Sequence, residues 1–462
     1  MLLTSDIARE IYSSIKDEPI IDYHTHLPVA DILNDHRFEN LWELWLKHDH
    51  YKWRLMRGCG VPERFITGAG SPHEKFLAFA EILPLAIGNP VYQWVHMELE
   101  AVFGITSLLS KETAEEIWQQ ANEKLVNEIS VGSLLKQFNV SFVGTTDDPA
   151  DCLQSHRKLS EKGYSVTVLP TFRPDRYHSV DQPGKFSQAL KDLSNKVNRP
   201  IETFDDLLSA LRQRHDDFHD AGCLMSDHGL NHCPVGHADI SELNSILKKS
   251  LSGVAATPEH WEMFAGEILR SVARWNAEKN WTMQLHLGPE RNVNSRLSQI
   301  TGVDSGFDTM GSWPQTKKLI SFLDELNSTE QLPKTIVYNL NPIESESICA
   351  ALQNFQETPL AGKLQYGPAW WLLDHVAGIK RQLEIITNQS ALGHHIGMLT
   401  DSRSFTSFVR HDYYRRILSS FLADKVISGE MPDNIELLTE TARKVASSNA
   451  SQYIQGTPIR TN

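Results

Sequence analysis

The sequence has few cysteines, no long hydrophobic run and no cluster of basic residues. The five cysteines among 462 residues are widely scattered, which argues against a disulfide framework and favours a reducing, cytoplasmic location. No stretch reaches the roughly 18 apolar residues of a membrane-crossing helix, and the N-terminal residues are too mixed in polarity for a signal peptide. With a net charge of −14, neither nucleic acid nor a membrane is expected as a partner. The remaining composition, 40% hydrophobic and 22% charged residues, is typical of a soluble enzyme.

Two histidines follow a short apolar segment near the N-terminus, in the sequence Ile20-Ile21-Asp22-Tyr23-His24-Thr25-His26. Side chains alternate between the two faces of a strand, so His24 and His26 are expected to point the same way. Two imidazoles on one side can hold one divalent cation. The motif is weak by itself, because His48-Asp49-His50 repeats it in a polar, tryptophan-rich stretch. From the motif alone, a metal site and two ordinary histidines are equally supported.

Short apolar segments recur along the chain, and each ends in a polar cluster. Including the one that begins at Ile20 there are eight, the others being Val140–Gly144, Tyr164–Leu169, Gly222–Met225, Thr282–Leu285, Lys334–Tyr338, Lys363–Tyr366 and Gly393–Leu399. Helical patterns lie between them, and strands that alternate with helices pair in parallel. The sequence therefore predicts an α/β protein with a (β/α)8 TIM-type barrel, whose chemistry lies at the carboxyl ends of the strands.

Residues 29–136 show apolar side chains at helical spacing and no strand pattern. This stretch is too long for a single crossover between two strands. It therefore predicts an inserted helical subdomain after the first strand. The barrel is then made of residues 1–28 and 137–462, and the helices beyond residue 408 pack on its outside.

Asp401 follows the eighth predicted strand, which neighbours the first in a closed barrel. A carboxylate there can complete a site of two histidines and one carboxylate that leaves positions open for substrate. Arg403, two residues further on, can stabilise an anionic substrate or a developing oxyanion. The alternative is a structural Asp–Arg ion pair that holds a loop.

Other polar residues at predicted strand ends leave two explanations open. Arg173 ends the third strand and can clamp a carboxylate or form a structural salt bridge. His286 ends the fifth strand, where a single histidine is more often a hydrogen-bonded core residue than a ligand. Asp227 and His228, at the end of the fourth strand, have the same ambiguity.

Six segments stand in order along the chain: His24-Thr25-His26, Asp49–Arg54, Thr171–Asp175, Ser226–Gly229, Met283–Gly288 and Gly397–Phe405. Together they resemble uronate isomerase, the glucuronate isomerase of the amidohydrolase superfamily. The similarity extends over nearly the whole chain. The last segment is specific to the family, whereas His-x-His marks only the superfamily.

The resemblance implies a metal-dependent hydrolase-like barrel with a helical insertion after strand one. It implies an aldose–ketose isomerase that interconverts D-glucuronate with D-fructuronate and D-galacturonate with D-tagaturonate, hexuronates of glucuronate catabolism. One divalent metal ion, zinc or manganese, is expected, and its implied ligands are His24, His26 and Asp401. Catalytic roles are implied for Asp401, Arg403 and Tyr51, and substrate contacts for Arg173, His286 and Trp371. A homo-oligomer is expected.

The sequence departs from the common family pattern at three places. They are Gly311-Ser312-Trp313, Trp371-Leu372-Leu373-Asp374-His375 and Gly288-Pro289-Glu290-Arg291. All three lie at predicted strand ends or just after them. They therefore bear on substrate preference more than on the type of reaction.

Two other functions are compatible with the same barrel. A metal-dependent hydrolase, such as a lactonase or deaminase, is the alternative enzyme. Two-metal hydrolases of this superfamily usually carry a bridging lysine after strand four, where this chain has Ser226-Asp227-His228. A barrel that binds sugar without turnover is the third possibility, and the complete set of polar residues at one barrel mouth argues against it.

Overall fold

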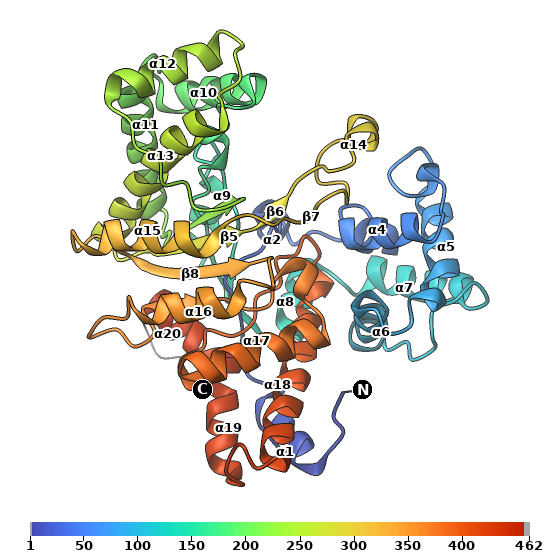
Figure 1. Ribbon diagram of the computed structural model, residues 1–462. Coiled ribbons are helices and arrows are strands. Elements are labelled where there is room, and N and C mark those ends of the chain that lie inside the picture. The colour runs from blue at the N-terminus through green and yellow to red at the C-terminus, as the bar shows by residue number, and fades with distance from the viewer. Residues whose placement is uncertain (1, 457–462) are drawn as a thin grey trace.

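The computed structural model describes residues 2–456. In this part of the chain, seven parallel strands form most of a barrel, seen at the centre of Figure 1. They are β1 (Ile20–Asp22), β2 (Val140–Gly144), β3 (Thr167–Leu169), β4 (Met225–Leu230), β5 (Thr282–Leu287), β8 (Lys334–Asn339) and β9 (Leu364–Tyr366). The strands pair in the orders β1-β2-β3 and β4-β5-β8-β9, and Phe172 joins the two groups by bridging to Asp147 and Ser226. The fold is the expected (β/α)8 type.

The eighth position of the barrel is filled by an irregular segment instead of the expected strand at Gly393–Leu399. Gly397 has φ +79°, and a Cβ on it would lie 2.0 Å from the carbonyl oxygen of Val445. Asp401 also has a positive φ, of +50°. These left-handed conformations prevent a continuous ladder of backbone hydrogen bonds.

A buried aspartate of β1 holds this segment in place. The amide and the hydroxyl of Thr400 donate to the two carboxylate oxygens of Asp22, at 2.9 Å and 2.6 Å. Two backbone bonds follow, from Asp401 N to His24 O at 3.1 Å and from His26 N to Ser402 O at 2.9 Å. The hydroxyl of Tyr23 also donates to the carbonyl of Gly397 at 3.1 Å. The barrel is therefore closed between its first and eighth positions by two side chains and two backbone bonds.

The fourth strand differs from its predicted range, since β4 begins where the expected Gly222–Met225 ends. Polar residues continue this strand because their side chains have partners. The hydroxyl of Ser226 lies 2.9 Å from Nε2 of His228 and accepts a hydrogen bond from Asn276 at 2.7 Å. A pattern of apolar residues cannot reveal a strand whose polar groups are satisfied in this way.

Seven α-helices connect β1 to β2 in the stretch expected to be helical, residues 29–136, and the last ends one residue beyond it. They are α2 (Val29–Leu33), α3 (Leu41–Trp45), α4 (His50–Gly58), α5 (Pro72–Ile82), α6 (Pro90–Phe103), α7 (Ala114–Asn127) and α8 (Val131–Gln137). Figure 1 shows α4 to α7 on one side of the barrel. Phe79 and Leu99 of these helices belong to the same hydrophobic cluster as Val143 of β2 and Leu285 of β5. The division into a subdomain and a barrel stays a prediction.

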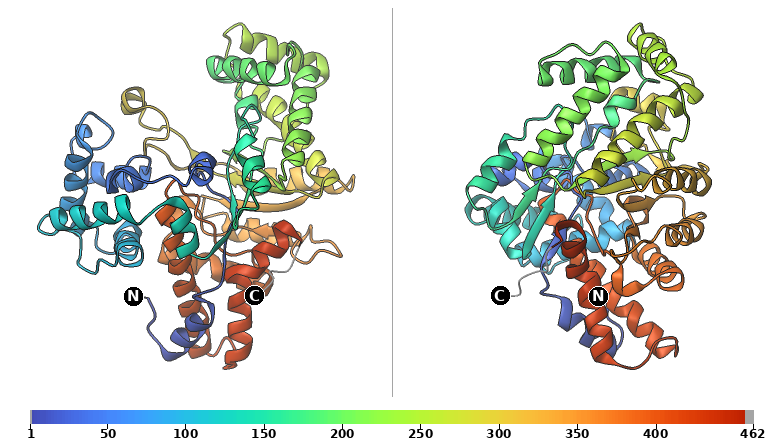
Figure 2. Two further views of the ribbon diagram at one scale, coloured as in Figure 1. Left: turned by 180° about the vertical axis from the view of Figure 1, so that it is seen from behind. Right: turned by 90° about the vertical axis from the view of Figure 1, so that its left-hand side faces the viewer.

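The remaining helices surround the barrel. Between strands lie α9 (Gln154–Glu161), α10 (Pro183–Val197), α11 (Phe204–Asp220), α12 (Ile240–Leu251), α13 (Pro258–Glu278), α14 (Ser295–Thr301), α15 (Gln315–Asn327), α16 (Ser345–Gln353) and α17 (Val376–Gln389). At the ends of the chain lie α1 (Asp6–Ile15), α18 (Val409–Ile427), α19 (Ile435–Arg443) and α20 (Asn449–Gln455). Figure 2 shows the green helices α10 to α13, which have their own hydrophobic cluster, projecting away from the blue helices of residues 29–136. No helix within residues 2–456 has both the length and the apolar character needed to cross a membrane.

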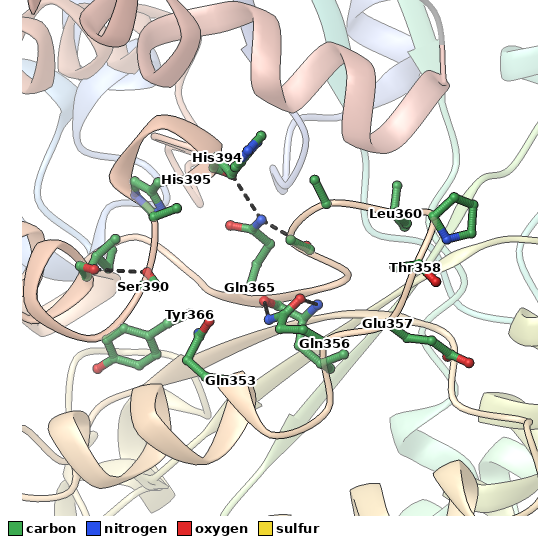
Figure 3. A pocket seen from close by; sticks show the side chains of 16 residues that line it. Gln353, Gln356, Glu357, Thr358, Leu360, Gln365, Tyr366, Ser390, His394 and His395 are labelled. Atoms are coloured by element: carbon green, nitrogen blue, oxygen red, sulfur yellow. Dashed lines mark hydrogen bonds between the residues drawn. The ribbon is translucent and has the colours of Figure 1, made fainter.

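A cavity of about 400 Å³ lies at the amino-terminal ends of β9 and the eighth segment (Figure 3). Gln356, Thr358, Gln365 and His395 are among its lining residues. None of the candidate site residues named above lines this cavity. In a (β/α)8 barrel this end serves stability, and the opposite, carboxyl end carries the chemistry.

Candidate active site and metal centre

Two histidines and an aspartate meet at the carboxyl end of the barrel. Nε2 of His24 and Nε2 of His26 lie 3.2 Å and 3.1 Å from Oδ1 of Asp401. The histidines follow β1, and Asp401 belongs to the segment in the eighth position. The structure thus brings together the three residues that the resemblance implies as metal ligands.

A second group of possible ligands shares His24. Asp227 of β4 is fully buried, and its Oδ1 lies 2.6 Å from Nδ1 of His286 on β5. Oδ2 of Asp227 lies 3.9 Å from Nδ1 of His24. Within each group, His24–Asp227–His286 and His24–His26–Asp401, the ligand atoms lie within 4.8 Å of one another.

The place of Asp227 was left open by the sequence. Alternation along β4 decides it, because Ser226 and His228 form their hydrogen bonds toward Asn276 of α13 while Asp227 points to His24 and His286. Once this segment is recognised as a strand, the period of two identifies the inward-facing residue. The sequence did not identify Asp227 as a site residue because its polar segment was not recognised as part of a strand.

The donor atoms of both groups fit a divalent cation. Nδ1 of His24 and Nε2 of His286 are buried and form no hydrogen bond within the described residues. Buried polar atoms without partners are costly, and a bound cation can satisfy such atoms. Imidazole nitrogens and carboxylate oxygens together are typical ligands of zinc and of related transition metals.

Burial and charge set the protonation of these residues. Burial lowers the pKa of His26 to about 4, so its imidazole is neutral at pH 7 and has a lone pair to donate. Burial alone raises the pKa of Asp401, but the hydrogen bonds and charges of His24 and His26 outweigh it, and the net pKa lies well below the ordinary value. The centre therefore combines neutral and anionic donors, which is what a cation requires.

A pocket beside Asp401 contains two further predicted site residues. Tyr51 and Arg403 line it together with Asp401. Tyr51 lies in the first turn of α4, where its amide donates to the side chain of Asp49 at 2.9 Å. Its hydroxyl is buried and has no hydrogen bond to any described residue. Nη2 of Arg403 lies 3.7 Å from Oδ2 of Asp304, and both side chains are partly exposed. A carboxylate, a phenol and a guanidinium are thus available at one pocket.

Arg173 forms an ion pair with Asp227, one of the possible metal ligands. Its Nη1 lies 3.0 Å from Oδ2 of Asp227, and its Nε donates to Asp175 at 3.0 Å. The side chain is about one-fifth exposed (22%) and does not line the pocket of Tyr51. The structure therefore contains the structural salt bridge that was one of the two explanations, and the expected substrate contact stays a prediction.

Trp371 is buried beside His50, which lines the pocket of Tyr51 and Arg403. Its ring is 5.6 Å from the ring of His50 in an edge-on arrangement, and the guanidinium of Arg291 lies 4.7 Å over it. Its backbone has φ +52°, which an L-residue rarely adopts. Such strain is concentrated at functional sites, and it is compatible with the expected substrate contact.

The sequence as a whole can be compared with known proteins. The family model described as glucuronate isomerase matches residues 1–454. The chain belongs to the glucuronate isomerase family. The uronate isomerase of Opitutus terrae is 43% identical over 455 residues, which are 98% of this chain and 96% of the relative.

Two crystal structures resemble this family member over nearly their full length. Uronate isomerase from Thermotoga maritima has a TM-score of 0.92 and 33% identity, with 98% of each chain covered. Glucuronate isomerase from Caulobacter crescentus has a TM-score of 0.90 and 26% identity, with 100% of this chain and 98% of that chain covered. These findings confirm the family and the barrel, and they do not favour the hydrolase alternative.

Two of the three departures from the family pattern lie on one excursion between β5 and α15. It contains α14 and the short antiparallel pair β6 (Pro289–Glu290) and β7 (Thr309–Met310), which the sequence did not predict. Nη1 of Arg291 lies 2.9 Å from Asp308, and the carbonyl of Asp308 accepts from Arg54 of α4 at 2.8 Å. Figure 1 shows this excursion extending toward α4. The excursion that carries two of the departures thus contacts α4.

One contact at the centre was not foreseen. Nε1 of Trp370 donates to Oδ2 of Asp401 at 2.9 Å, and its ring lies 4.6 Å from that of His286. Trp370 belongs to the polar and aromatic cluster that follows the seventh predicted strand. The sequence alone could not show which of the two adjacent tryptophans contacts Asp401. In the folded protein Trp370 does so, and Trp371 packs against His50.

Proposed function

We propose that this member of the glucuronate isomerase family interconverts D-glucuronate with D-fructuronate and D-galacturonate with D-tagaturonate. The relatives described above are uronate and glucuronate isomerases. One observation carries the proposal: Oδ1 of Asp401 lies 3.2 Å and 3.1 Å from two imidazoles, beside a pocket that Tyr51 and Arg403 also line. Such a site offers a base, a hydroxyl and a cation to a small sugar acid.

The reaction exchanges protons without net oxidation. A base removes the proton from C2, and the electrons of the C2–H bond form an enediolate whose negative charge rests on the oxygen of C1. That oxygen then gains a proton, the hydroxyl oxygen of C2 loses one, and C1 receives a proton to give the ketose. The protein must supply a base, an acid and donors that stabilise the oxyanion.

The geometry supports one assignment of these roles. Asp401, helped by Tyr51, takes the C2 proton, and Arg403 stabilises the enediolate oxygen. Arg173 orients the sugar and its carboxylate, with His286 and Trp371 as further contacts. The pKa of Asp401 lies below its ordinary value, so its carboxylate is ionised and open to a proton.

We assign a divalent metal ion, zinc or manganese, to His24, His26 and Asp401. When bound, such an ion supplies positive charge that polarises and orients the oxygens of a sugar acid. His286 and Asp227 are the alternative ligands beside the shared His24. Metal analysis of the purified protein identifies the ion.

The decisive experiment is incubation of the purified protein with glucuronate and galacturonate, in the presence and absence of a chelator. Ketose formation and incorporation of solvent deuterium at C1 or C2 are expected. In Asp401→Asn, kcat is expected to fall by roughly 10²–10⁴-fold, because the proton acceptor is lost.

Several outcomes would contradict the proposal. Hydrolysis of esters or amides without ketose formation would overturn the activity. A fully active Asp401→Asn protein would overturn the role of this base. The unfolding midpoint of the variant is the control for its fold.

We also propose a cytoplasmic homo-oligomer with a hexuronate as its small-molecule partner. The scattered cysteines support the compartment. Light scattering of the purified protein measures the assembly. A monomer at cellular concentrations would contradict that part of the proposal.

A further inference from the structure

Arg410 joins two segments that carry site residues. It lies in the first turn of α18 and is 4% exposed. Its Nε and Nη2 donate to Oδ2 of Asp374 at 3.0 Å and 2.7 Å, and Nη2 also donates to the carbonyl of Thr400 at 2.6 Å. Thr400 directly precedes Asp401, and Asp374 follows the turn that begins at Trp371. One guanidinium therefore connects the backbone next to Asp401 with the side chain of Asp374.

The same guanidinium also contacts the inserted helices. Its central carbon lies 5.8 Å from the ring centroid of Tyr51 on α4 and 4.6 Å from that of Trp94 on α6. The rings of Tyr51 and Trp94 are themselves 5.9 Å apart and edge-on. A buried cation held against aromatic faces restricts both partners. Arg410 is thus the common neighbour of three elements: the segment of Asp401, the loop of Trp370 and Trp371, and the helix of Tyr51.

An arginine is suited to this position for a physical reason. Its planar fork can serve a carboxylate, a carbonyl and an aromatic face at once, whereas the ammonium of lysine is a single point charge. The charges of Arg410 and Asp374 are buried as a pair, and removal of one leaves the other uncompensated. Small displacements of catalytic groups cost large factors in rate.

We propose that Arg410 is a positioning residue of the isomerase, with Asp374 as its partner. It lines the pocket of Tyr51, Asp401 and Arg403, and it sets the relative placement of Asp401, Trp370 and Tyr51 rather than acting on the reacting atoms. This inference rests on the proposed function for its kinetic consequence. The conformational consequence can be measured without turnover.

The test compares Arg410→Lys and Arg410→Ala with a matched control on the same helix. Arg415 of α18 is equally buried (3% exposed), and it donates to the backbone carbonyls of Lys16, Glu18 and Pro19, which precede the amino-terminal end of β1, whereas the centre lies at the carboxyl end. Arg410→Ala is expected to lower kcat by about 100-fold with KM changed by less than about threefold, because orientation is lost while substrate contacts remain. Arg415→Lys is expected to lower only the unfolding midpoint.

Three further readouts separate positioning from a general loss of structure. Millimolar guanidinium ion is expected to restore part of the kcat of Arg410→Ala and to leave Arg415→Ala unaffected. Asp374→Asn is expected to lower kcat, and its combination with Arg410→Lys is expected to cost less than the product of the two separate losses, since both act on one contact. Hydrogen exchange in peptides covering Trp370–Asp374 and Thr400–Arg403 is expected to increase in Arg410→Lys but not in Arg415→Lys.

Each contrary outcome overturns the inference. An Arg410→Ala protein with the kcat of the wild type refutes positioning. A raised KM with unchanged kcat indicates a substrate contact instead. Equal losses in the Arg410 and Arg415 variants indicate a structural role only. If the wild-type protein itself forms no ketose, the proposed function fails, and the exchange measurement still decides whether Arg410 orders the two segments.

Discussion

The indole of Trp370 binds one carboxylate oxygen of Asp401 and leaves the other oxygen to the two histidines. Nε1 of Trp370 donates to Oδ2 at 2.9 Å, whereas Oδ1 faces the two histidines at 3.1–3.2 Å. A carboxylate held at one oxygen cannot rotate freely. Its other oxygen is therefore presented to the histidines in a fixed direction, which pre-organises the centre.

Replacement of Trp370 by phenylalanine tests this arrangement. The variant keeps an aromatic ring beside His286 but loses the hydrogen bond to Asp401. A hydrogen bond to a charged group contributes about 1.5–3 kcal/mol, so kcat is expected to fall by roughly 10- to 100-fold. Trp281→Phe is the matched control, because it removes an indole bond of 3.2 Å to His219 away from the centre. Equal kinetics of the two variants would refute the role of Trp370.

The two candidate groups of metal ligands make different predictions for metal content. His24 belongs to both groups, so His24→Ala is expected to lose the metal in either case. His26→Ala is expected to lose it as well, whereas His286→Ala is expected to retain most of it, because His286 lies outside the proposed set. Metal analysis after gel filtration measures the occupancy. The reverse pattern would transfer the assignment to Asp227 and His286.

Closure of the barrel depends on Asp22. The Asp22→Ala variant leaves the amide and the hydroxyl of Thr400 without their partners, and a loss of about 1–3 kcal/mol in the free energy of unfolding is expected. Thr400→Val removes one of the two bonds, so a smaller loss is expected. Urea unfolding of both variants gives the comparison. A Thr400→Val protein that is less stable than Asp22→Ala would contradict this account of the closure.

Asp147 is expected to make stability depend on pH. It accepts hydrogen bonds from the hydroxyl of Thr145 at 2.7 Å and the amide of Thr171 at 3.2 Å, but burial still raises its pKa from 3.8 to about 7. Between these values the folded protein binds a proton that the unfolded chain has lost. This contribution to stability therefore decreases as the pH rises from about 4 to 7.

Asp147→Asn removes that titration. Its free energy of unfolding is expected to exceed that of the wild type at pH 8 and to approach it at pH 4, since each pKa unit corresponds to about 1.4 kcal/mol. Asp181→Asn, on the surface, is the control. A difference between Asp147→Asn and wild type that does not change with pH would show that folding does not raise the pKa of Asp147.

Strands with continuous apolar cores could be predicted from the sequence to within a few residues. The predicted Thr282–Leu285 and Lys334–Tyr338 agree with β5 and β8, because the inner and outer faces of both strands are buried. The polar strand around Asp227 and the irregular segment around Gly397 could not be predicted in the same way. Their backbone conformation depends on Asn276 and Val445, which are distant in the sequence.

The sequence by itself determined the order of the elements, the family, and the residue types available for chemistry, because periodicity and local motifs are properties of neighbouring residues. Only the tertiary structure decided which of them meet. Asp401 and His24 come from the last and first positions of the barrel and meet only when the barrel closes. Trp370, Asp227 and Arg410 join the centre through contacts between separate elements. Such contacts depend on how the chain closes on itself, and no local pattern encodes that closure.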